Sequence, residues 1–102
     1  MEPRAFFEEL VAEASEHAKE LAGVKAVLKF DIVGLGMWRL QIDGTDLQIQ
    51  EGDGPAGCTF AIGADDFQRI ANGTLKPMVA VMEGKLKVSG DISLALKLSK
   101  LF

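Results

Sequence analysis

The chain has 102 residues, of which 48% are hydrophobic and 25% are charged, a composition typical of an ordinary globular protein. This length predicts one domain over residues 1–102. The formal net charge of −4 argues against nucleic acid as a partner, because phosphate binding requires a basic surface. A single cysteine, Cys58, and a single histidine, His17, exclude an internal disulfide and the common zinc sites, so we expect no metal and no cofactor.

The first twenty residues contain several glutamates and no continuous apolar core, so they do not resemble a secretory signal. No apolar stretch approaches the ~20 residues of a membrane span. We therefore expect a cytoplasmic protein. The last third of the chain contains five lysines, which form either a patch for anionic headgroups or a scattered set of solvated side chains: Lys76, Lys85, Lys87, Lys97 and Lys100.

The N-terminal segment has the pattern of an amphipathic helix. Pro3 suits the first position of a helix, and Phe7, Leu10 and Val11 begin a run of apolar residues at helical spacing. Gly23 suits the end of that helix. The pattern predicts one helix between Pro3 and Gly23.

The period then changes to an alternation of apolar and polar residues, which is typical of half-buried strands. Three such runs, at residues 25–32, 37–43 and 47–50, are separated by short glycine-rich turns and predict an antiparallel meander. A loop at residues 51–57 and a fourth strand at residues 58–62 are predicted to follow.

Two short helices and a fifth strand are predicted next. The first helix begins at Asp65, a suitable N-cap residue, and ends before Gly73. The second occupies residues 74–83, with Pro77 near its first turn. Alternating residues then predict a strand at residues 85–89.

Residues 91–102 alternate apolar and polar side chains, as in a strand, but consist mainly of helix-forming residues. Asp91 is a suitable N-cap, and Lys97 and Lys100 are favourable near a helix C-terminus. We therefore predict a helix, with the strand as the alternative.

The helices predicted at residues 74–83 and 91–102 have more apolar circumference than the stripe of roughly 100° that a surface helix needs. The excess fits a tightly packed core, a dimer interface, or the wall of a cavity that holds an apolar ligand. Met78 and Met82 suit the last two, because flexible thioether side chains repack around different shapes.

No catalytic or nucleotide-binding motif is present in the sequence. The acidic residues outside the N-terminal helix lie mainly in turn sequences or, like Asp65, at a helix end, where they serve local geometry. We therefore expect no enzymatic activity.

The order of these elements and several short motifs resemble the sterol carrier protein 2 family of small lipid-binding domains. The motif-level similarity runs from residue 58 to the end of the chain, whereas residues 1–57 agree in layout and show a weaker similarity of sequence. It comprises CTFAI at residues 58–62, DF at 66–67, NGTLKP at 72–77, MEGKLKVSGD at 82–91 and LALKL at 94–98.

The resemblance implies an α+β fold, in which a five-stranded, largely antiparallel sheet is covered on one face by about four helices, with a hydrophobic tunnel between the layers. By the same analogy, inward strand residues and apolar helix residues line the tunnel and bind lipid. These residues are Trp38, Leu40, Phe60, Phe67, Ile70, Leu75, Met78, Val79, Met82, Leu86, Leu94 and Leu98.

The resemblance further implies a stand-alone domain that binds an apolar lipid without catalysis. The lipid would be a fatty acid, an acyl-CoA, an isoprenoid or a sterol-like molecule, and its transfer through transient membrane contact is left open. The alternative is an interaction or accessory module. Such a module would pack its apolar helices on an enzyme partner or a second copy, and would present a lipid to that enzyme.

Overall fold

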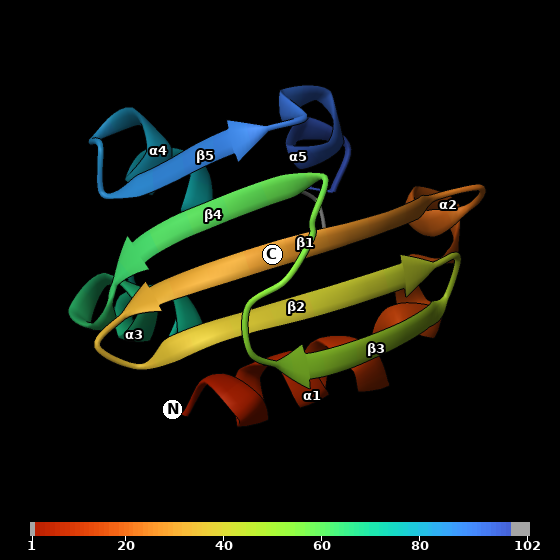
Figure 1. Ribbon diagram of the computed structural model, residues 1–102, viewed down its shortest axis with the longest axis horizontal. Helices are drawn as coiled ribbons and strands as arrows, with labels where there is room; N and C mark the ends of the chain where they lie inside the picture. The colour runs from red at the N-terminus through yellow and green to blue at the C-terminus, as the bar shows by residue number, and fades with distance from the viewer. Residues whose placement is uncertain (1, 99–102) are drawn as a thin grey trace.

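Five strands form one mixed sheet in the order β3-β2-β1-β4-β5 (Figure 1). The structure, a computed structural model, describes the backbone of residues 2–98 and the side chains of residues 2–95. The strands are β1 (Lys25–Val33), β2 (Gly36–Asp43), β3 (Asp46–Glu51), β4 (Cys58–Gly63) and β5 (Leu86–Gly90). Strands β1 and β4 pair in parallel, and the other neighbours pair antiparallel. The predicted α+β fold with a largely antiparallel sheet is therefore confirmed.

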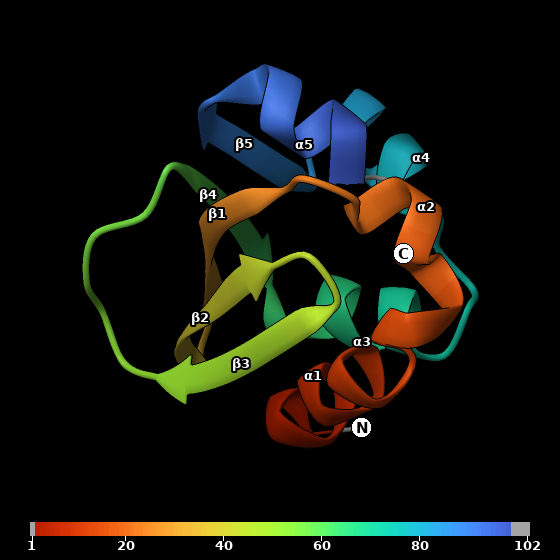
Figure 2. The same cartoon turned by 90° about the vertical axis from the view of Figure 1, so that its right-hand side faces the viewer.

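The helices cover one face of the sheet, as Figure 2 shows. They are α1 (Pro3–Ala12), the 3₁₀ helix η1 (Ala14–His17), α2 (Ala18–Leu21), α3 (Ala64–Ala71), α4 (Pro77–Met82) and α5 (Ile92–Leu98). None of the helices within residues 2–98 has the length and apolarity needed to cross a bilayer. The predicted residues 99–102 of the last helix lie outside the described residues.

The single N-terminal helix predicted between Pro3 and Gly23 is wrong. The α-helical hydrogen bonding stops at Ala12, and η1 and α2 continue the segment in a different direction (Figure 2). Phe7, Ala14 and Leu21 are all buried, and the bend keeps each of them against the interior as the segment crosses the molecule. Tertiary packing thus overrides a continuous local helical preference.

The ends of the other helices also differ from expectation. The helix predicted at residues 74–83 is shorter, because α4 begins only at Pro77 and the backbone of Lys76 before this proline is extended. Helix α3 begins at Ala64, directly after β4, so Gly63 occupies the N-cap position and the prediction of Asp65 as N-cap is wrong. Asp65 and Asp66 lie in the first turn, where a carboxylate is favourable beside the positive end of the helix dipole. The prediction of Asp91 as the N-cap of α5 is confirmed, because the Leu94 N–H donates to Asp91 Oδ1 at 3.2 Å.

The core lies between the helices and the inward face of the sheet. Alternate residues of β1, β2 and β4 are buried there, as their period-two pattern predicts. Phe7 of α1 is completely buried, and its ring centroid lies 4.8 Å from that of Phe30 on β1 and 6.0 Å from that of Trp38 on β2. These contacts fix α1 across the first two strands.

The opposite face of the sheet is crossed by residues 52–57, which carry the chain from β3 to β4 (Figure 2). Asp53 accepts a hydrogen bond from Lys29 Nζ at 3.0 Å and another from the Gly54 N–H at 2.7 Å. The hydrogen bond from Lys29 is the main cause that lowers the pKa of the Asp53 carboxyl. At the end of this loop, the Gly57 N–H donates to the Val27 carbonyl at 2.9 Å, which places β4 beside β1.

Gly90 joins β5 to α5 at a point where a side chain cannot fit. Its φ is +92°, and a Cβ at this position would lie 2.5 Å from the Gly57 carbonyl oxygen. We predict that Gly90→Ala lowers the free energy of unfolding by about 3 kcal/mol, because left-handed strain and backbone overlap combine. Urea unfolding measures this loss.

Gly44→Ala is the matched control, since Gly44 also has a positive φ of +59°, but no atom lies within 4 Å of the place that a Cβ would occupy there. The Gly44→Ala substitution should lower the free energy of unfolding by only about 1 kcal/mol. If both substitutions lower the free energy of unfolding by the same amount, the close approach of residues 57 and 90 is contradicted.

Candidate functional site

An apolar pocket with a volume of about 310 Å³ lies between the sheet and the helices on the β4–β5 side. Among the side chains that the structure describes, every residue that lines it is apolar. The lining residues are Phe6, Phe30, Phe60, Ile62, Phe67, Ile70, Pro77, Met78, Val81, Leu86, Val88, Ile92 and Ala95. The pocket can therefore hold a hydrocarbon, but its described lining offers a ligand no side-chain hydrogen bond or charge.

The floor of the pocket is built by the register of three neighbouring strands. Phe60 of β4 pairs with Phe30 of β1 on one side and with Val88 of β5 on the other. The rings of Phe30 and Phe60 stack with centroids 5.1 Å apart and an interplanar angle of 15°. Ile62 and Leu86 form a second paired row. Because paired residues of neighbouring strands point to the same face, the floor is continuous.

Helix α3 forms one wall, because its apolar residues fall on one face. Phe67 is buried and Ile70 is half-buried, and both line the pocket. The ring of Phe67 meets that of Phe6 from α1 edge to face, with centroids 5.3 Å apart. Arg69 lies on the outer side of the helix and pairs with Asp66 at 3.5 Å.

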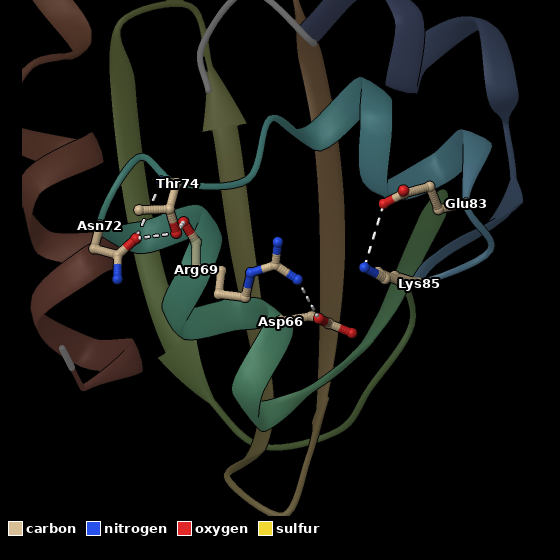
Figure 3. A network of polar contacts seen from close by, with 6 residues as sticks. All are labelled: Asp66, Arg69, Asn72, Thr74, Glu83 and Lys85. Atoms are coloured by element: carbon tan, nitrogen blue, oxygen red, sulfur yellow. Dashed lines mark hydrogen bonds and ion pairs between the residues drawn. The ribbon is translucent and has the colours of Figure 1, made fainter.

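Helix α4 forms the outer wall, and hydrogen bonds in the connection before it fix its position. The Thr74 Oγ1 lies 2.7 Å from Asn72 Oδ1 and 3.2 Å from the Arg69 carbonyl oxygen, so its one proton is shared between these two acceptors (Figure 3). Leu75 is buried, and Pro77 then begins α4. This connection holds α4 over β5, where Met78 and Val81 face the pocket.

Two ion pairs lie beside the space between α3 and α4. Figure 3 shows Arg69 with Asp66 on α3, and Lys85 with Glu83 in the turn after α4. The Lys85–Glu83 pair has a nitrogen–oxygen distance of 3.3 Å. All four side chains are at least partly exposed, so these pairs add little stability.

Helix α5 closes the end of the pocket with Ile92 and Ala95. Its first turn is fixed by Asp91, which accepts hydrogen bonds from the Ser93 hydroxyl at 2.6 Å and from the Leu94 N–H at 3.2 Å. These hydrogen bonds lower the pKa of the Asp91 carboxyl, with the Ser93 hydroxyl as the main cause.

Cys58 is buried at the start of β4 and does not line the pocket. Burial raises the pKa of its thiol, and the charge of Asp91 raises it further. The cysteine is therefore a packing residue and not a reactive nucleophile. Within residues 2–98, no cluster of three or more His, Cys, Asp or Glu side chains is placed to hold a metal ion.

The structure brings five of the twelve predicted lipid-binding residues together in the pocket lining: Phe60, Phe67, Ile70, Met78 and Leu86. Six others lie outside the lining: Trp38, Leu40, Leu75, Val79, Met82 and Leu94. The side chain of Leu98 lies outside the described residues. Contact between a lipid and any of these twelve residues stays a prediction.

The positions of four of the six outlying residues have a structural reason. Trp38 and Leu40 belong to β2, where they are buried away from the pocket; the Trp38 ring lies near Phe7 and below the guanidinium of Arg4, 5.2 Å from its carbon atom. Val79 and Met82 point outward from α4, with 40% and 83% of their surface exposed. The pocket therefore occupies only the β4–β5 half of the space below the helices.

Eight lining residues were not among the predicted ones: Phe6, Phe30, Ile62, Pro77, Val81, Val88, Ile92 and Ala95. For three of them the sequence contains a usable signal. Phe30, Ile62 and Val88 share the inward face of their strands with residues that were expected to be buried. Phe6 precedes Leu10 by four residues in α1; it is partly buried against the core, and its ring meets that of Phe7 edge to face.

The profile of the SCP-2 sterol transfer family matches residues 7–102 of the chain. Mouse hydroxysteroid dehydrogenase-like protein 2 is 37% identical over 81 residues, which are 76% of this chain and 16% of the mouse protein. Human sterol carrier protein 2 is 30% identical over 95 residues, which are 90% of this chain and 17% of the human protein. The chain thus spans less than a fifth of the length of these two curated relatives.

The fold matches a solved structure over almost its whole length. The solution structure of palmitated SCP2L2 from Aedes aegypti superposes with a TM-score of 0.79 at 23% identity, covering 99% of this chain and 94% of that one. The sequence match, the mixed sheet and the apolar pocket agree with one another. The chain belongs to the SCP-2 sterol transfer family, whose domains bind lipids and sterols and are generally not catalytic.

Proposed function

We propose that the chain binds one long-chain lipid, with its hydrocarbon part in the pocket, and carries out no reaction on it. The observation that carries this proposal is the lining, whose described part consists entirely of apolar side chains from three strands and four helices. The volume of about 310 Å³ falls at the lower end of the ~300–1,000 Å³ of small-molecule sites. A single extended chain suits such a space better than a bulky ring system does.

The expected affinity follows from the burial of methylene groups. Each buried CH₂ contributes about 0.8 kcal/mol, so a chain of about sixteen carbons would gain on the order of 12 kcal/mol before the costs of association. Those costs reduce the net affinity to roughly the micromolar range. Palmitate is the first ligand to test, because the superposed Aedes aegypti protein is described as palmitated.

The absence of polar groups from the described lining supports a binding role over catalysis. General acid–base and nucleophilic chemistry require a titratable side chain within hydrogen-bond reach of the substrate. Asp66, Arg69, Glu83 and Lys85 lie beside the pocket but already pair with one another, two by two. They are positioned to remain in water beside a ligand headgroup.

A second candidate function is the presentation of a bound lipid to an enzyme. The lengths of the relatives favour it, since the matching region is less than a fifth of the mouse and human proteins. A homodimer that uses the same apolar helices also stays a prediction. Sedimentation of the purified chain tests the homodimer: a concentration-independent dimer that binds no lipid favours it, whereas a carrier or a lipid-presenting domain sediments as a monomer with lipid bound.

We predict that palmitate binds one-to-one with a dissociation constant in roughly the micromolar range. Isothermal titration calorimetry in vesicle-free buffer measures it directly. Butyrate is the control, and it should not bind measurably because it lacks about twelve of the methylene groups, each of which contributes about 0.8 kcal/mol. Failure to bind palmitate or any other long-chain lipid would refute the proposed function.

A second prediction uses two neighbouring residues of β5. Val88 lines the pocket, whereas Ser89 is exposed and points to the other face of the strand. Val88→Trp should fill the pocket and weaken palmitate binding by at least about tenfold, since the indole takes the space of several methylene groups. Ser89→Trp, the matched control, should bind palmitate like the wild type.

Thermal unfolding of both variants checks that they are folded, and Val88→Phe replaces Val88→Trp if the larger ring unfolds the chain. A folded Val88 variant that binds palmitate as tightly as the wild type would show that lipid binds elsewhere.

A further inference from the structure

The pocket is open to solvent at one end and closed at the other. At the end formed by α4 and α5, the lining residues Met78, Val81 and Ile92 are 54%, 42% and 48% exposed. At the end beside α1 and α3, the lining residues Phe30 and Phe67 are only 8% and 4% exposed. A hydrocarbon chain therefore enters at the α4–α5 end and extends toward α1.

Phe6 of α1 lies at the closed end of the pocket. Its ring meets that of Phe67 with centroids 5.3 Å apart, and that of Phe7 with centroids 5.4 Å apart. Phe6 lines the pocket, whereas Phe7 is completely buried and does not line it. The Phe6 ring thus separates the end of the pocket from the core around Phe7.

The core behind Phe6 is already filled. The Phe7 ring packs against Phe30 at 4.8 Å and against Trp38 at 6.0 Å between ring centroids. Trp38 and Leu40 are buried there and lie outside the pocket lining. Removal of the Phe6 ring would therefore lengthen the pocket by about the space of that ring, and Phe7 would form the new end.

The charged groups beside the pocket lie away from this aromatic end. Figure 3 shows them as two partly exposed ion pairs beside the space between α3 and α4, Asp66–Arg69 and Glu83–Lys85. A headgroup at the Phe6 end would lose its hydration and find no hydrogen-bonding side chain in the described lining, which costs free energy. The headgroup therefore stays at the open end, and the terminal methyl group points toward Phe6.

We propose that Phe6 is the end wall that the terminal methyl group of the bound lipid meets, so that this residue sets the longest chain that the pocket buries. The inference rests on the proposed function and deepens it, since it gives the pocket a preference for chain length. Each methylene group that is buried should tighten binding by about fourfold. Methylene groups beyond the length of the pocket stay in water at the open end and add little.

Calorimetric titration with saturated fatty acids of about ten to about twenty carbons tests the proposal. The affinity of the wild type should rise with chain length up to a break and then level off. Phe6→Ala should move this break by about three methylene groups to longer chains, so that a chain of that length binds at least about tenfold more tightly than it binds the wild type. Phe6→Trp should move the break to shorter chains. A break at the same chain length in all three proteins would overturn the proposal.

Met78→Ala is the matched control, because it trims the lining at the open end. It should weaken the binding of all chain lengths without moving the break to longer chains. A shift to longer chains as large as that of Phe6→Ala would overturn the assignment to Phe6. Thermal unfolding checks that the variants are folded, and Phe6→Leu, with a smaller expected shift, replaces Phe6→Ala if the latter unfolds.

The direction of the bound chain has its own readout. A fatty acid of the break length, labelled with ¹³C at its terminal methyl group, should show nuclear Overhauser effects to the rings of Phe6 and Phe67. The same acid labelled beside its carboxyl group should contact Met78 or Val81. The reverse assignment would overturn the proposal.

The failure of this inference can be distinguished from the failure of the proposed function. A wild type that binds palmitate, with a break that no substitution of Phe6 moves, refutes the end wall and leaves the proposed function standing. A wild type that binds no chain of any length refutes the proposed function, and the inference with it.

Discussion

The burial of Phe7 against the sheet determines which part of the interior is filled and which part stays open. The helix α1 lies against β3, and its Phe7 ring contacts Phe30 and Trp38 and fills the space above β1 and β2. Above β4 and β5 the covering elements are α3 and the short helix α4, together with the start of α5. These elements surround the row formed by Phe30, Phe60 and Val88 without filling the space above it. The pocket is the consequence of this uneven coverage.

An empty apolar cavity reduces stability, because side chains around it lack packing partners. A hydrocarbon chain supplies those partners, which links the stability of the fold to the proposed ligand. The same arrangement leaves α4 thinly covered on its outer side. The pocket and the exposed apolar face of α4 thus have one structural origin, a six-residue helix placed over an edge strand.

The sequence predicts the elements well where the local pattern and the tertiary packing agree. The alternation in β1, β2 and β4 identified their inward faces, and Asp91 marked the start of α5. The break after Ala12 was not predictable from periodicity, since the apolar spacing continues across it and only packing bends the segment. The parallel pairing of β1 with β4 was also not predictable from the sequence, because it depends on the path of residues 52–57 across the face of the sheet opposite the helices.

The candidate site was predicted in part, for a similar reason. Residues such as Phe60 and Leu86 could be assigned to the pocket lining from the sequence, because the strand alternation and the order of the family motifs both pointed to them. Trp38 and Leu40 share that inward orientation but lie under α1, and the sequence does not show which strands each helix covers. On α4 nearly every residue is apolar, so hydrophobicity alone could not separate Met78, which faces the pocket, from Met82, which faces solvent.

In the proposed function, the pocket between α3, α4 and the β4–β5 side of the sheet holds the hydrocarbon chain. Nuclear Overhauser effects between ¹³C-labelled palmitate and the assigned side chains of the protein locate this chain. The methylene protons should contact Phe60, Ile70 and Leu86. Contacts confined to the polar face of the sheet, near Asp53 and Gln50, would contradict it.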